Sequence, residues 1–218
     1  MSGIIYKALR IKFEKTGVAK YISHLDLMRV FSRSLVRAGV EVAHSEGFNP
    51  RPKIVFASAI SLGLESLCEF ADIKLPPSER EALEIEIYEK IKGVFPQGIN
   101  IVDVYEPEND FKDIDRTRYH IFFKADGVDA GELKKLFDGD VFVEKKPGVN
   151  INLKDYICEI NISDGSQEYI LADVVVKTSQ EMFLNPENII KGVNLKFAVE
   201  DYVIRKVGVL DRDNGEFR

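Results

Sequence analysis

The side chains best suited to chemistry lie between residues 24 and 37, where a histidine and three arginines follow a helix-start signal. His24 comes directly after Ser23, and its imidazole is a candidate general acid or base because its unperturbed pKa lies near neutrality. Arg29, Arg33 and Arg37 recur every four residues, so a helix would place them in one stripe. Planar guanidinium groups bind phosphate through paired hydrogen bonds. The spacing therefore predicts a polyanion-binding stripe, with an ordinary solvated helix face as the alternative.

A second group of candidates follows in residues 45–53, which read Ser-Glu-Gly-Phe-Asn-Pro-Arg-Pro-Lys. The two prolines fix the backbone around Arg51 and remove local donors, while glycine and asparagine permit tight turning. A loop restrained in this way loses little entropy when it binds a ligand. An exposed Phe48 would stack on a base while the cations contact phosphates; the alternative is a rigid connector with Phe48 in the core. The RNA-binding candidates of this loop are Phe48, Asn49, Arg51 and Lys53.

Capping residues place the first group on a helix over residues 23–38. Ser23 is the predicted N-cap, Asp26 its capping-box partner, and Gly39 the residue that ends the helix. Asp26 falls on the side of the arginines, where we expect it to orient one guanidinium.

The rest of the pattern predicts an α+β fold of two tandem ferredoxin-like units with antiparallel sheets, residues 1–107 and 116–218. The first unit reads as strand, helix, strand, strand, helix, strand, with another short strand proposed at residues 40–43. These elements are expected at 4–13, 23–38, 53–60, 67–75, 78–92 and 99–105. After a polar linker at 106–116, the expected elements are strand 119–124, helix 129–137, strand 141–144, hairpin 156–163 and 169–177, helix 186–191 and strand 195–207.

Charge is segregated along the chain. Residues 1–60 contain ten Lys/Arg and four Asp/Glu, whereas residues 61–218 contain twenty and thirty-two, within a net charge of −6. This distribution favours a local polyanion-facing patch on the first unit over a protein that attracts polyanions with its whole surface.

Several classes of site lack support in the sequence. Cys68 and Cys158 stand alone in apolar, strand-like contexts, which predicts buried reduced thiols. Neither the cysteines nor the three histidines have metal-ligand spacing, and no Gly-rich phosphate loop occurs, so we expect no metal and no cofactor. No run approaches the roughly 20 apolar residues that cross a bilayer, so we expect a cytoplasmic protein with no membrane partner.

The segments Tyr-Ile-Ser-His-Leu-Asp-Leu-Met-Arg (21–29) and Gly-Phe-Asn-Pro-Arg-Pro-Lys-Ile (47–54) resemble the radical-SAM-linked family of uncharacterised bacterial proteins. The resemblance is densest over residues 9–75, with echoes at 181–187 and 204–210, and departs at Arg51, where that family commonly has histidine. It implies a domain found beside, or fused to, a radical SAM enzyme, often near a ribonuclease G gene. Since this chain has no three-cysteine cluster motif, radical chemistry would belong to the partner; the resemblance itself implies no activity for this chain, and whether it is an enzyme stays open.

Three functions from different classes follow. The leading one is a non-catalytic RNA-binding accessory module for modification or processing of tRNA or rRNA. The second is a metal-independent endoribonuclease that uses His24, with Arg51 or Lys20 stabilising the charged transition state. The third is a protein-interaction domain that docks a radical SAM enzyme through the acidic second unit.

Overall fold

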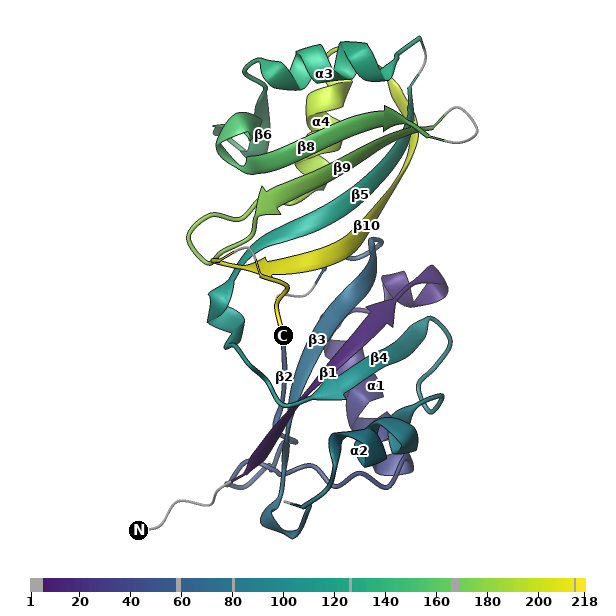
Figure 1. Cartoon of the computed structure of the whole chain (residues 1–218), viewed down its shortest axis with the longest axis vertical. Coiled ribbons are helices and arrows are strands. Elements are labelled where there is room, and N and C mark those ends of the chain that lie inside the picture. The colour runs from purple at the N-terminus through teal and green to yellow at the C-terminus, as the bar shows by residue number, and fades with distance from the viewer. Residues whose placement is uncertain (1–5, 58–59, 80, 126, 166–168, 214) are drawn as a thin grey trace. The chain divides into compact units, whose positions relative to one another are not determined.

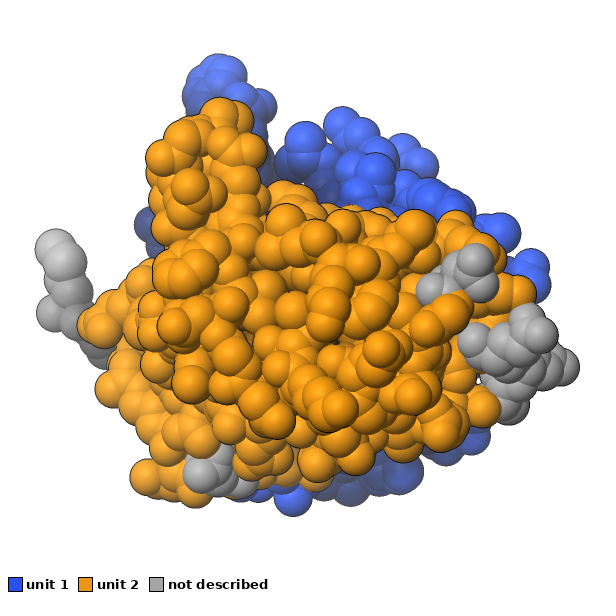
Figure 2. Space-filling view, turned by 90° about the horizontal axis from the view of Figure 1, so that it is seen from above, with its two compact units in different colours: residues 1–111, 218 blue, residues 112–217 orange. Residues whose placement is uncertain are grey.

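A computed structural model describes residues 6–57, 60–79, 81–125, 127–165, 169–213 and 215–218. The chain divides into two compact units, residues 1–111 with Arg218 and residues 112–217 (Figure 2). Both units combine helices with antiparallel strands, so the fold is α+β. Within the described ranges, no helix is both long enough and apolar enough to cross a membrane.

Unit 1 runs strand, helix, strand, strand, helix, strand. Its elements are β1 (Lys7–Lys15), α1 (His24–Arg37), β2 (Ile54–Phe56), β3 (Glu65–Leu75), α2 (Glu84–Ile91) and β4 (Ile99–Tyr105). The strands are antiparallel in the order β4-β1-β3-β2. Two predicted strands lie partly outside the described residues. These are strand 4–13, at its residues 4 and 5, and strand 53–60, at its residues 58 and 59.

Alternating side chains of β1 explain why both helices of unit 1 pack on one face of its sheet (Figure 1). Leu9, Ile11 and Phe13 are fully buried in one cluster with side chains of α1 and α2, as the two-residue period of a strand requires. The rings of Phe13 and Phe31 lie 4.7 Å apart at a tilt of 59°. An aromatic pair of this geometry contributes about 1 kcal/mol beyond its buried area, which fixes α1 against the sheet.

Among its described residues, unit 2 contains two α-helices, four main strands and an extra two-stranded hairpin. Its elements are β5 (Ile114–Ala125), α3 (Ala130–Asp138), β6 (Phe142–Lys146), β7 (Val149–Asn152), β8 (Ile157–Asp164), β9 (Ile170–Lys177), α4 (Glu187–Asn194) and β10 (Val199–Asp211). The main strands are antiparallel in the order β10-β5-β9-β8. The hairpin β6–β7 forms a separate two-stranded sheet.

Two elements of unit 1 differ from the prediction. The helix expected over residues 78–92 is shorter, because Leu83 has extended backbone as its N-cap and its N–H donates to the Glu86 carboxylate at 3.4 Å. Residues 40–43 form no strand: the Ala43 N–H donates to the Lys74 carbonyl at 2.7 Å, but no ladder follows. Their apolar side chains, Val40 and Val42, fill the core instead.

Two features of unit 2 also differ. The linker expected at residues 106–116 already contains the start of β5 at Ile114. Cys68 is buried as predicted, but the prediction is wrong for Cys158, which is exposed. Cys158 lies on β8, the last strand of the unit's sheet order, so among the described residues no further strand pairs with one edge of β8.

Candidate functional site

The first turn of α1 is fixed by a short hydrogen-bond chain. The Asp26 N–H donates to Ser23 Oγ at 3.2 Å, and that hydroxyl donates to Asp26 Oδ2 at 2.7 Å. Arg29 Nη1 donates to Asp26 Oδ1 at 2.7 Å. The pKa of Asp26 is lowered, mainly by the hydrogen bond from the Ser23 hydroxyl and next by the hydrogen bond from Arg29. The predicted N-cap and the predicted orientation of one guanidinium are therefore confirmed.

The three arginines of α1 differ in what they contact. Arg29 keeps 67% of its side chain exposed, and Arg33 is exposed with no hydrogen bond or ion pair to any described residue. Arg37 is also exposed, but its Nη2 donates to Ser34 Oγ at 3.3 Å and to the Val94 carbonyl. A four-residue step turns about 40° beyond a full helical turn, which carries Arg37 around the helix towards Val94. Two of the three are thus presented to solvent without a structural tether outside α1.

Two hydrogen bonds between Ser45 and Arg51 close the loop that follows α1. The Ser45 N–H donates to the Arg51 carbonyl at 2.8 Å, and the Arg51 N–H donates to Ser45 Oγ at 3.0 Å. His44 and Pro52 form a β-bridge next to them. Within the loop, Gly47 has φ of 122°, a conformation that other residues rarely adopt. The conformation of the loop is therefore specified by these hydrogen bonds, the bridge and Gly47.

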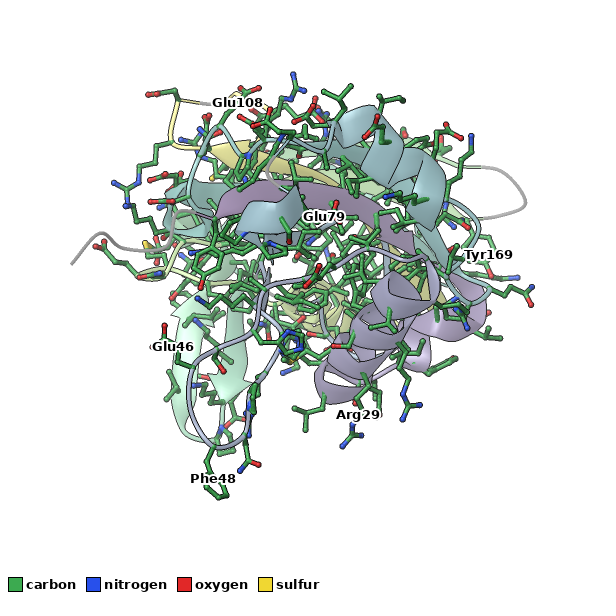
Figure 3. All side chains as sticks on the ribbon, turned by 90° about the horizontal axis from the view of Figure 1, so that it is seen from below. Arg29, Glu46, Phe48, Glu79, Glu108 and Tyr169 are labelled. Carbon is green, nitrogen blue, oxygen red and sulfur yellow. The ribbon has the colours of Figure 1, made fainter. Side chains whose placement is uncertain are left out.

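Phe48 lies at the outermost point of this loop and points away from the unit, on the same side of the view as Arg29 (Figure 3). Its side chain is 103% exposed, so the alternative of a buried Phe48 is excluded. Asn49 and Arg51 are exposed beside it. One loop thus exposes both an aromatic ring and a guanidinium to solvent.

Lys53 occupies a different environment from the rest of the loop. Its Nζ lies 3.9 Å from the centre of the Tyr6 ring, and its N–H donates to the Ala43 carbonyl at 2.7 Å. The side chain is half-buried. Lys53 therefore anchors the base of the loop, and its charge is shared with an aromatic face.

A pocket of about 250 Å³ joins the last turns of α1 to the base of the loop. Leu35, Val36, Val40 and Pro52 supply apolar walls, while Ser32, Glu41 and His44 supply polar edges. Val36 is 77% exposed, and neither it nor His44 stood out in the sequence as a site residue. The available signal was the wheel position of Val36, about 20° from Arg29 on the side of the helix that carries the arginines. We call the exposed face of α1, this pocket and residues 44–53 the α1–loop surface.

His24 lies away from that pocket. Its ring packs edge-on against Phe56, with centroids 5.6 Å apart and an interplanar angle of 81°. Twelve residues of helix separate it from Val36, about 18 Å along the axis. In the described part of the chain the imidazole has no hydrogen bond or ion pair. Lys20 is the other cation proposed to act with His24, and its Nζ lies 5.4 Å from the centre of the Tyr21 ring. Among the described residues, no hydrogen bond or ion pair joins His24 to Arg51.

Metal-binding groups are also absent from the described residues, where no three His, Cys, Asp or Glu side chains gather. The α1–loop surface presents two exposed guanidiniums, of which Arg29 is paired with Asp26, together with one exposed ring and a pocket lined by apolar and polar side chains.

Comparisons with known proteins identify a family but point to no activity. The model of DUF2344, described as "Uncharacterized protein conserved in bacteria", matches residues 8–186. No curated protein matches the chain. Among solved structures, an unknown protein from Galdieria sulphuraria is 12% identical, with 93% of this chain and 99% of that chain covered and a TM-score of 0.27. The acetolactate synthase small subunit from Thermotoga maritima is 14% identical, with 96% and 98% covered and a TM-score of 0.27. Likenesses this low carry no argument about function.

Proposed function

The chain belongs to the DUF2344 family of bacterial proteins, and from the α1–loop surface we propose that it is an RNA-binding module. One observation carries the proposal: Arg29 and Arg33 are exposed on α1, while Phe48 is fully exposed on the adjoining loop. Cations beside an exposed ring match both parts of RNA, since guanidinium binds phosphate and a ring stacks on a base.

Local charge supports the same proposal. Residues 24–53 contain five basic and three acidic side chains, a balance of +2, whereas residues 61–218 contain twenty basic and thirty-two acidic. One of the three acids, Asp26, is already paired with Arg29. A polyanion would therefore be drawn to the α1–loop surface and repelled by much of the remaining chain.

We also propose a more specific description of the fold than α+β. We infer that each unit is ferredoxin-like, because the order of strands in the sheet, fourth-first-third-second along the unit, is the same in both. Such sheets host RNA recognition in other proteins, an analogy that adds no residue to the site.

The test is RNA binding as a function of salt. Labelled tRNA and an rRNA fragment are titrated with the chain and followed by fluorescence anisotropy. Arg33→Glu should weaken binding at least tenfold and flatten the dependence on salt, because one phosphate contact becomes a repulsion. The matched control is Lys134→Glu, an exposed cation on α3 in the acidic unit, which should bind like the unaltered chain. Undetectable or salt-insensitive binding would overturn the proposal.

Two related ideas stay predictions. A role as an accessory module for RNA modification, with a radical SAM enzyme as the docking partner, is tested by co-purification from cells. The endoribonuclease centred on His24 is tested by RNA cleavage, as described in the Discussion.

A further inference from the structure

We propose that the α1–loop surface selects unpaired RNA, with one base stacked on Phe48 and a neighbouring base in the pocket between α1 and the loop. This inference rests on the proposed RNA-binding function and names the form of RNA that the surface takes. The proposed site includes the residues that sequence patterns indicated and, in addition, the pocket with its polar lining residues.

The position of Phe48 favours single strands over duplexes. Leaving a phenylalanine side chain in water forgoes about 1.5–3 kcal/mol of burial energy, yet the Ser45–Arg51 bonds hold the loop so that the ring stays 103% exposed. Both faces of the ring are therefore open to stack on a base. In a duplex the base faces are already stacked on each other and only their edges reach the grooves, whereas unpaired bases offer their faces.

The pocket suits one flat heterocycle. Its volume of about 250 Å³ equals roughly eight water molecules, too little for a helix or a strand of a partner protein. The lining includes apolar side chains such as Val36 and Pro52, which suit the faces of a ring, and the polar residues Ser32, Glu41 and His44. A hydroxyl donates or accepts, a carboxylate accepts from the exocyclic amine of a base, and an imidazole offers ring nitrogens.

The backbone of the RNA would follow the cations around these two base sites. Arg29 and Arg33 are one turn apart on α1, about 6 Å along its axis. Arg33 directly follows Ser32, which lines the pocket, and Arg51 is exposed three residues after Phe48. Cations flanking a stacking ring and a base pocket form the kind of groove that tracks single-stranded nucleic acid.

The experiment compares one RNA sequence in two forms, an unstructured single strand and the same strand annealed to its complement, at equal salt. The single strand should bind at least tenfold tighter than the duplex. Phe48→Ala should weaken single-strand binding by roughly 5- to 150-fold, the range that loss of one base–aromatic stack produces, and Phe48→Tyr should restore it. Leu195→Ala, which truncates a side chain that is 64% exposed at the end of α4, is the control and should change neither affinity.

The outcomes separate this inference from the proposed function. Equal binding of both forms, unaffected by Phe48→Ala, would overturn the selection of unpaired RNA and leave RNA binding through the cations intact. Failure to bind either form would overturn both. Tight single-strand binding that Phe48→Ala and Ser32→Ala each weaken would support the stack and the pocket together.

Discussion

The backbones of Ser45 and Arg51 meet at the base of the loop, where the Ser45 N–H donates to the Arg51 carbonyl at 2.8 Å and Ser45 Oγ accepts from the Arg51 N–H at 3.0 Å. Ser45→Ala removes the second bond, worth about 1 kcal/mol, and loosens the loop that carries Phe48. We expect RNA affinity to fall several-fold while the melting temperature changes little. Ser45→Thr keeps the hydroxyl and should behave like the unaltered chain; a Ser45→Ala variant with unchanged affinity would show that loop closure does not matter for binding.

Arg37 should act on stability more than on binding. Its guanidinium donates to Ser34 Oγ and to the Val94 carbonyl, so it ties the end of α1 to the segment after α2. Arg37→Ala should lower the free energy of unfolding by about 1–2 kcal/mol, measured by urea denaturation. Arg33→Ala, which removes a guanidinium without such bonds, should change it by no more than about 0.5 kcal/mol. The reverse ranking would contradict these assignments.

A buried ion pair that should contribute to stability lies outside the site. Arg10 is fully buried, and its Nε and Nη2 donate to the two Asp72 carboxylate oxygens at 2.7 and 2.8 Å. Asp72→Ala would leave the buried Arg10 guanidinium without its carboxylate and should cost about 3–5 kcal/mol, read from urea denaturation. Arg29→Ala breaks an ion pair whose side chains are 67% and 55% exposed, and should cost under about 1 kcal/mol. Equal losses from the two variants would argue against a buried pair.

Tyr105 should make unit 1 sensitive to alkaline pH. Burial raises the pKa of Tyr105 to about 12 from its ordinary value of 10.0. Because the folded pKa is raised, the stability linked to this group is fully present below pH 10.0 and is lost as pH rises through about 12. The loss should be on the order of 2 kcal/mol. Urea denaturation of Tyr105→Phe should show a shallower decline over this interval, and identical curves would rule out the contribution.

His24 should not cleave RNA. Its imidazole contacts Phe56 edge-on and, among the residues described, has no carboxylate or cation bonded to it that would assist proton transfer. Labelled RNA incubated with the chain in EDTA should stay intact. Cleavage that His24→Ala abolishes, and that His120→Ala leaves unchanged, would instead establish the endoribonuclease.

Local rules were sufficient to predict α1 from the sequence. Ser23 and Asp26 form the cap that their spacing indicated, and Leu27 and Phe31 are buried on the face that helical periodicity assigns to the core. The loop was predicted as a restrained segment because two prolines flank Arg51. Its closure by Ser45 depends on which backbone groups come together, and spacing alone does not specify that.

The remaining features depend on tertiary contacts. Arg37 matches the four-residue repeat, yet it binds Val94, fifty-seven residues away, and Lys53 stacks on Tyr6. Strand β6 matches the strand expected at 141–144, but β7 and its pairing with β6 were not predicted, although Pro147 and Gly148 mark the turn, because the strands are short and make their own sheet. The pocket lined by Ser32 and His44 requires α1 and the loop base to pack together, a long-range relation that no local pattern carries.

The most direct test of RNA binding at the α1–loop surface is ultraviolet cross-linking of the chain to a single-stranded, uridine-containing RNA, followed by peptide mapping. The structure predicts cross-links within residues 44–53, centred on Phe48, and their loss in Phe48→Ala. Cross-links confined to residues 112–217, with RNA bound and residues 44–53 unmodified, would contradict the account.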